Sequence, residues 1–307
     1  MNFLERIVVY NYKIPYLLRE FLHQILFFIK NKNRFHSFFF KKNSITKEVQ
    51  MLNNDGIIFL DEDYCLDAKQ LKEMNLFLDK IDKERDEDIN KKKISYQTDI
   101  IGSNELFLSL VVQPHILSTV SSYLGALPKI AFLKAWKVNP GNDDQSEMSF
   151  HMDHHGHRFL KVFWYLNDVD VGCGHHEFIK DTHYQPRLDK RLLNESLSVN
   201  NQIIKKRQKK GSYLVDNTII ESGFKDNLVK INGKAGSGFI EDTRGLHRGT
   251  PMPKNKHRII YQALYVPYIT YKDKGLHKIK NKNAFNKICE DNPKNVNIFK
   301  SVFSEII

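Results

Sequence analysis

The stretch Ser149-Phe150-His151-Met152-Asp153 organises the interpretation of this chain. Residues i and i+2 of a strand point to the same face, so His151 and Asp153 can hold one metal ion together. Three more histidines lie within residues 154–157 and compete as ligands. Because an HxD pair often arises by chance, the alternative for this cluster is a solvated loop with hydrogen-bonded imidazoles. A third ligand from elsewhere would favour the metal site.

A second run, Asp242-Thr243-Arg244-Gly245-Leu246-His247-Arg248-Gly249, supplies a distant imidazole. His151, Asp153 and His247 would form a two-histidine, one-carboxylate set that leaves coordination positions open, as in non-haem Fe(II) oxygenases. The open positions suit a bidentate 2-oxo acid, such as 2-oxoglutarate, and dioxygen. Arg258 follows His247 by 11 residues, and a guanidinium binds a carboxylate in a two-pronged way.

Arg258 is therefore our candidate for binding the distal carboxylate of 2-oxoglutarate. We expect its strand to run antiparallel beside the strand of His247, after a turn at residues 249–255. Lys134, on another predicted strand, is a second candidate for holding a carboxylate.

Short strands separated by Gly, Pro, Asn and Asp predict a mainly β protein with a sandwich, jelly-roll or barrel core. The predicted strands cover residues 57–60, 130–138, 159–166, 177–179, 238–240 and 258–266. A polar, helical insertion is expected near residues 186–232. The core domain is predicted at residues 46–270, with a basic extension at 1–45 and a basic helical tail at 271–307.

The amino-terminal extension has apolar residues at roughly helical spacing between Leu17 and Ile29, with basic residues among and after them. One interpretation is a helix packed on the domain. The other is an amphipathic helix on an anionic membrane surface, involving residues 1–43. In the tail, five apolar residues could dock a helix: Phe285, Ile288, Phe299, Val302 and Phe303.

The formal charge of +11 indicates basic surfaces, with an anionic substrate or membrane as alternatives. No nucleic-acid-binding motif accompanies the charge, so we expect no nucleic-acid partner. The three cysteines are widely spaced, which favours a reducing, cytoplasmic compartment. No run approaches the roughly 18 apolar residues of a membrane span, and the first residues do not resemble a signal peptide.

The chain resembles the phytanoyl-CoA dioxygenase family over roughly residues 50–268. The resemblance rests on the HxD stretch, on Gly245-Leu246-His247-Arg248-Gly249 with Arg258, and on three further segments. These are Leu160-Lys161-Val162-Phe163-Trp164-Tyr165-Leu166-Asn167-Asp168-Val169-Asp170, Gly174-His175-His176-Glu177-Phe178-Ile179-Lys180-Asp181-Thr182-His183, and Asn54-Asp55-Gly56-Ile57-Ile58-Phe59-Leu60 with Tyr123-Leu124-Gly125.

The resemblance implies a double-stranded β-helix (jelly-roll, cupin-like) core with flanking helices. It also implies that His151, Asp153 and His247 bind Fe(II) and that Arg258 anchors 2-oxoglutarate. One departure is Lys180-Asp181-Thr182-His183, where the family usually has Pro-Gly-Ser-His. Substrate inference is affected by this change, and His183 is either structural or part of the substrate pocket.

The function expected from the resemblance is hydroxylation of a small molecule, with 2-oxoglutarate and O2 as co-substrates and succinate and CO2 as products. An anionic substrate is one possibility, because the predicted insertion carries Lys205-Lys206-Arg207. The alternative is a non-catalytic or differently metallated cupin-like binding protein, which would not need Arg258 beyond the metal.

Overall fold

The computed structural model describes residues 15–31, 46–85, 92–141, 148–194, 220, 223–270, 279 and 282–303. The strands are β1 (Ile57–Phe59), β2 (Lys93–Tyr96), β3 (Lys129–Val138), β4 (Leu160–Tyr165), β5 (His176–Ile179), β6 (Leu228–Ile231), β7 (Gly238–Glu241), β8 (His247–Gly249) and β9 (Arg258–Val266). The helices are α2 (Tyr16–Asn31), α3 (Lys47–Asp55), α4 (Ala68–Glu84), α5 (Thr98–Ile101), α6 (Glu105–Val111), α7 (Pro114–Leu124), α9 (Gln185–Asn194), α12 (Asn283–Asp291) and α13 (Val296–Val302). Short 3-10 turns cover Glu62–Tyr64, Lys225–Asn227 and Pro293–Asn295.

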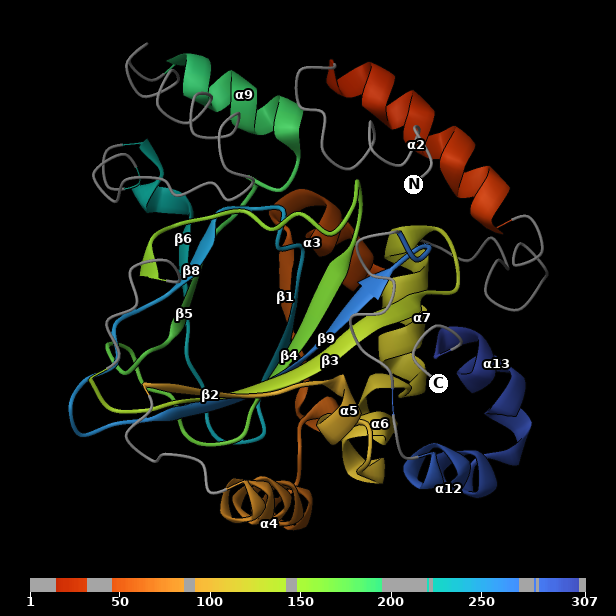
Figure 1. Cartoon of the computed structure of the whole chain (residues 1–307). Coiled ribbons are helices and arrows are strands. Elements are labelled where there is room, and N and C mark those ends of the chain that lie inside the picture. Colours follow the sequence, from red (N-terminus) through yellow and green to blue (C-terminus); the bar gives the residue numbers. More distant parts are fainter. Residues whose placement is uncertain are drawn as a thin grey trace.

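Two antiparallel sheets face each other at the centre of the molecule (Figure 1). The larger has the strand order β1-β7-β4-β9-β3-β2, and the smaller has the order β6-β5-β8. A bridge between His151 and His247 adds the HxD segment to the edge of the smaller sheet. This arrangement confirms the predicted double-stranded β-helix core with flanking helices.

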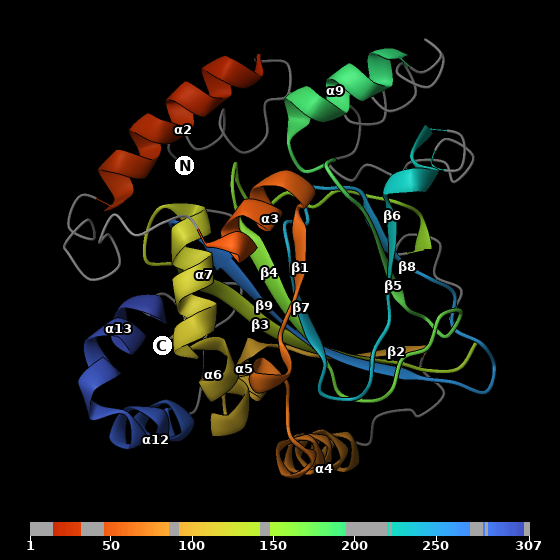
Figure 2. The same cartoon turned by 180° about the vertical axis from the view of Figure 1, so that it is seen from behind.

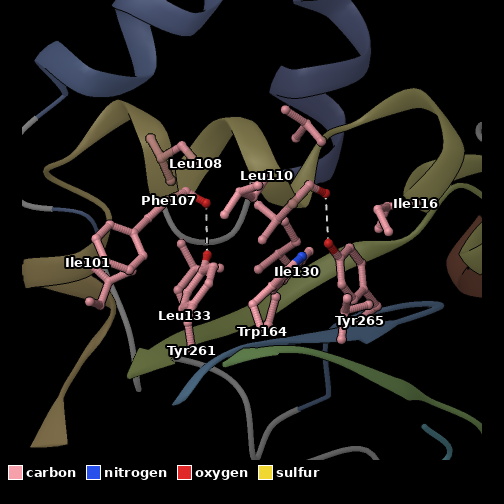
Figure 3. Packing of buried hydrophobic residues seen from close by; sticks show 14 of the residues in the cluster. Ile101, Phe107, Leu108, Leu110, Ile116, Ile130, Leu133, Trp164, Tyr261 and Tyr265 are labelled. Carbon is pink, nitrogen blue, oxygen red and sulfur yellow. Dashed lines mark hydrogen bonds between the residues drawn. The ribbon is translucent and has the colours of Figure 1, made fainter. Parts of the chain in front are cut away.

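Helices cover the outer face of the larger sheet (Figure 2). Leu133, Trp164 and Tyr261 point outward from their strands and are buried in the main core cluster with residues of α6, α7, α12 and α13. The hydroxyls of Tyr261 and Tyr265 donate hydrogen bonds to the carbonyls of Phe107 and Val111, at 2.9 and 2.7 Å (Figure 3). These bonds connect α6 directly to β9.

The opposite face of the larger sheet meets the smaller sheet. Alternation along each strand sends Phe163, Phe239 and Ile260 inward, where they pack against Phe178 and Ile231 of the smaller sheet. Because the two faces of β4 and β9 are both covered, nearly every residue of these strands is buried. The space left between the sheets contains the candidate site.

Several helix ends follow from local sequence. Asp67 and Gln70 form a capping box at the start of α4, each side chain accepting a hydrogen bond from the other's backbone N–H. Pro114 begins α7, and Gly125 ends it with φ of 78°, a left-handed conformation that glycine adopts without a Cβ clash. Proline and glycine therefore set the two ends of α7.

The sequence prediction differs from the structure in two places. Residues 228–231, assigned to the helical insertion, form β6 at the edge of the smaller sheet. Residues 93–96, which belong to none of the predicted strands, form β2, which pairs with β3. Both strands have only four residues, too few to show a clear period. The cluster Lys205-Lys206-Arg207 lies outside the described residues.

The tail folds back on the helical layer as α12 and α13. Its five predicted docking residues are all buried: Phe285, Ile288, Phe299, Val302 and Phe303. No single helix among those described has the length and apolarity of a membrane span; only the pair α6 and α7, bent by 46°, has both together. Most of their residues are buried in the helical layer of the core.

Candidate metal centre

Backbone hydrogen bonds bring His151, Asp153 and His247 together. The N–H groups of His151 and His247 each donate to the other's carbonyl at 2.9 Å, and the N–H of Asp153 donates to the carbonyl of Thr243 at 2.8 Å. The HxD segment and the start of β8 are therefore joined as neighbouring strands. One ligand atom from each of the three side chains lies within 4.8 Å of the others. The structure thus unites the three predicted ligands.

Both imidazoles are oriented for metal binding. Nδ1 of His151 lies 3.0 Å from the carbonyl of Ser149, and Nδ1 of His247 lies 2.9 Å from that of Gly245. Because a carbonyl only accepts, each Nδ1 must carry the proton, which leaves the lone pair of a neutral ring on Nε2. Nε2 of His247 lies 3.5 Å from the Asp153 carboxylate. A hydrogen bond on the far nitrogen is the usual way in which a protein orients a histidine ligand.

The pKa shifts of His151 and Asp153 favour the forms that bind metal ions, whereas that of His247 does not. Burial and the neighbouring His247 lower the pKa of His151 to about 4, so its ring is neutral at pH 7. Burial alone would raise the pKa of Asp153, but Lys161 and His247 hold it well below its usual value. Burial lowers the pKa of His247, but the carboxylates of Asp153 and Glu241 outweigh this and raise it overall.

Two partners of the ligands were not predicted from the sequence. Lys161 of β4 is buried, and its ammonium lies 2.5 Å from Asp153. Glu241 of β7 is fully buried, with one oxygen 2.9 Å from Nε2 of His176 and the other 3.9 Å from Nδ1 of His247. A lysine inside the apolar run 160–166 stands out in the sequence as a candidate functional residue. Strand alternation alone, however, does not show which face of this strand points toward the site.

The three ligands line a cavity of about 160 Å³ between the sheets, together with Arg258, Lys161 and Gln262. Since a water molecule occupies roughly 30 Å³, the cavity has room for about five waters or a short dicarboxylic acid. Arg258 donates to the carbonyl of Gly174. Among the described residues, Oε1 of Gln262 and Nε1 of Trp136 are buried without a hydrogen-bond partner. The cavity therefore offers a guanidinium and unused polar atoms to a ligand.

The expected pairing of the Arg258 strand is wrong. β9 pairs with β3 and β4 in the larger sheet, whereas β8, which contains His247, pairs with β5 in the smaller one. The segment between β8 and β9 crosses from one sheet to the other, so Arg258 and His247 meet across the cavity. Lys134 does not line this cavity; its ammonium lies 5.0 Å from the ring centre of Trp136. Its role with a carboxylate stays a prediction.

The segment Lys180-Asp181-Thr182-His183 supports the site. Asp181 adopts φ of 67°, the left-handed conformation that the usual glycine would take without strain. The hydroxyl of Thr182 donates to the carbonyl of Ile179 and accepts from the N–H of Leu246, next to His247. The tight turn is therefore retained without Pro-Gly, and the hydroxyl positions the start of β8.

His183 and His157 line a second cavity, of about 540 Å³, that lies beneath α2. A smaller cavity of about 40 Å³ shares both histidines and Arg244 with it and also contains Asp153. Arg244 is largely buried against the carboxylate of Asp242. His155 packs instead on the rings of Phe132 and Phe159. His155, His157 and His183 are therefore not among the three side chains of the candidate metal site.

We expect His183 to make stability fall with decreasing pH. Burial lowers its pKa to about 4, although Asp242 opposes the shift. The unfolded side chain takes up a proton near pH 6.5, so between these values the unfolded state binds more protons and stability is lost as pH falls. At pH 5 the contribution is about 2 kcal/mol. In urea unfolding at pH 7 and pH 5, His183→Asn should lose correspondingly less stability than wild type; equal losses would contradict the assignment.

No family model matches the chain, and no curated protein matches it. Among solved structures, HygX from Streptomyces hygroscopicus, with nickel and 2-oxoglutarate bound, covers 77% of this chain and 91% of its own, with 12% identity and a TM-score of 0.53. The epimerase SnoN in complex with Fe3+, alpha ketoglutarate and nogalamycin RO covers 73% and 85%, with 15% identity and a TM-score of 0.51. The chain shares their fold. At these identities the likeness concerns the fold alone.

Proposed function

We propose that this protein is an Fe(II)- and 2-oxoglutarate-dependent dioxygenase that hydroxylates a small molecule. The observation that carries the proposal is the convergence of His151, Asp153 and His247 on one cavity that also contains Arg258. Two imidazoles and one carboxylate suit Fe(II) and leave positions open for other ligands. The shared fold of HygX, which was solved with nickel and 2-oxoglutarate, is consistent with this function.

Different residues of this chain would have different roles in the proposed reaction. His151, Asp153 and His247 would hold the metal, with the two imidazoles oriented by their Nδ1 hydrogen bonds. Arg258 would bind the distal carboxylate of 2-oxoglutarate, and the inward-facing apolar residues of the two sheets would exclude water. When bound, Fe(II) would supply the dioxygen chemistry that converts 2-oxoglutarate to succinate and CO2 and oxidises the substrate.

The proposal also concerns the family, the substrate class and the cellular location of the protein. Similarity to the phytanoyl-CoA dioxygenase family rests on the motifs quoted above, and a family resemblance does not identify the substrate. Arg158 and Arg187 line the cavity beneath α2, and Arg244 lines both this cavity and the small one that contains Asp153. Because Asp181 and Asp242 already pair with Arg187 and Arg244, an anionic substrate stays a prediction from the sequence. A cytoplasmic location stays a prediction from cysteine usage, and all three cysteines are free.

The alternative is a non-catalytic or differently metallated cupin-like binding protein. One observation favours it: the ammonium of Lys161 lies 2.5 Å from Asp153. A cation at this position opposes the approach of a metal ion, because like charges repel strongly in a poorly solvated site. The two functions differ in whether Fe(II) and 2-oxoglutarate bind together.

Anaerobic absorption spectroscopy tests the proposal without knowledge of the substrate. We expect a weak visible charge-transfer band when Fe(II) and 2-oxoglutarate are added together, because the 2-oxo acid chelates the metal through two oxygens. The band should be absent in His151→Ala and present in His155→Ala, the matched control from the same histidine cluster. Folded protein that binds iron but gives no band would favour the cupin-like alternative.

A further inference from the structure

Helix α2 lies with its polar side toward the protein and its apolar side toward solvent. Arg19 and His23 are buried, whereas Leu17, Phe21 and Ile29 are 78%, 61% and 57% exposed. An ordinary surface helix has the opposite arrangement, with the apolar stripe on the core. Figures 1 and 2 show α2 at the end of the molecule that also carries α9.

Specific polar contacts hold α2 in this orientation. Glu20 forms an ion pair with His157. Nδ1 of His23 lies 2.9 Å from the hydroxyl of Tyr268, and the guanidinium of Arg19 donates to the side chain of Gln185. These bonds link α2 to three separate segments of the domain. Rotation that buried the apolar face would break all three.

The exposed face is a continuous apolar stripe. Positions 17, 21, 25 and 28 are spaced by four, four and three residues, so they lie along one side of the helix. Within the described part of the chain, six of the ten exposed large hydrophobic residues belong to α2: Leu17, Leu18, Phe21, Ile25, Phe28 and Ile29. This concentration distinguishes α2 from surfaces where single apolar residues are scattered.

The charged residues that flank α2 in the sequence indicate which partner covers the apolar stripe. Residues 1–43 contain two acidic residues, Glu5 and Glu20, and eight basic ones: Arg6, Lys13, Arg19, Lys30, Lys32, Arg34, Lys41 and Lys42. Glu20 and Arg19 are engaged on the inner side, by His157 and Gln185. An apolar helix face whose flanking sequence carries an excess of cations is typical of a helix that lies in the interface of an anionic bilayer. The run Phe38-Phe39-Phe40-Lys41-Lys42 adds aromatic and basic residues a short distance along the sequence.

We propose that the outer face of α2 docks this protein on an anionic membrane surface. The inner face of the same helix lines the cavity of about 540 Å³, through Tyr16, Glu20 and His23. His157 and Arg244 line both this cavity and the small one that contains Asp153, so the two cavities are adjacent. Docking through α2 would therefore place the cavity beneath this helix, and with it the neighbourhood of Asp153, close to the lipid surface.

Vesicle co-sedimentation of the full chain tests the proposal. We expect binding to vesicles of phosphatidylglycerol and phosphatidylcholine, weak binding to pure phosphatidylcholine, and weaker binding as ionic strength rises. Phe21→Ser/Ile29→Ser should reduce partition by on the order of a hundredfold, about tenfold for each large apolar side chain. Phe59→Ser/Leu76→Ser is the matched control, because these residues are 53% and 57% exposed elsewhere on the protein.

Circular dichroism should show that both double variants keep the wild-type fold, since the replaced side chains face solvent. Absence of binding to the anionic vesicles would overturn the proposal, as would equal losses in the α2 variant and the control. Light scattering after gel filtration gives a further outcome. A wild-type dimer that becomes a monomer in Phe21→Ser/Ile29→Ser would show that a second copy covers the face, and would also overturn the proposal.

Discussion

Asp153→Ala should abolish iron binding and also destabilise the fold. Loss of a direct ligand should weaken Fe(II) affinity by more than about 100-fold, the upper end for residues that only orient a ligand. The same change leaves the ammonium of Lys161, 2.5 Å away, without its carboxylate. Breaking a buried pair costs about 3 to 5 kcal/mol; we expect the lower end, because Asp153 keeps 20% of its side-chain surface exposed.

Lys161→Met separates the two effects. In Asp153→Ala/Lys161→Met the unpaired charge is gone, so urea unfolding should show most of the lost stability restored, while anaerobic Fe(II) titration should still show no binding. His151→Ala should lose iron with a smaller loss of stability, because it leaves the Lys161–Asp153 pair intact. If Asp153→Ala bound iron with wild-type affinity, Asp153 would not be a metal ligand.

The longer strands around the site could be predicted from the sequence. β3 and β9 have ten and nine residues, enough for alternation and turn residues to mark them. The period of two also placed His151 and Asp153 on one face. β8 has three residues and no detectable period, so His247 was a candidate by its residue type and by the resemblance to a family, not by a strand pattern.

Pairing between strands could not be predicted, because it depends on contacts distant in sequence. Arg258 and His247 are 11 residues apart, which suggested a hairpin, but the chain crosses between sheets instead. Lys161 shows a related limit. The strand from Leu160 to Tyr165 is buried on both sides, so its sequence does not distinguish the face toward the cavity from the face toward the helices.

The orientation of α2 is a third case. Its amphipathic pattern predicted a helix correctly, and a packed helix would ordinarily bury its apolar side. The structure buries the polar side because the domain presents His157, Tyr268 and Gln185 at that position. Such complementarity involves residues more than 100 positions away, which a local pattern cannot show.

Arg258→Ala should raise the 2-oxoglutarate concentration needed for the charge-transfer band by roughly 10- to 100-fold, because a charge-assisted pair contributes about 1.5 to 3 kcal/mol. Iron affinity should change little, since Arg258 binds no metal in the proposed site. The variant should also lose its preference for 2-oxoglutarate over 2-oxobutyrate, which lacks the distal carboxylate. Lys134→Ala tests the second candidate in the same assay; we expect little change, because its ammonium lies over Trp136 rather than in the cavity.

Lys161 makes this experiment decisive, because among the described residues that line the cavity it is the other lysine or arginine. If Lys161→Met loses the preference for a distal carboxylate and Arg258→Ala keeps it, then Lys161 is the anchor and the assignment of Arg258 is wrong. We expect the reverse, since Lys161 already contacts Asp153 while a planar guanidinium can bind both oxygens of a carboxylate at once. Arg258→Lys should therefore recover only part of the affinity, because an ammonium supplies the charge without the two-pronged geometry.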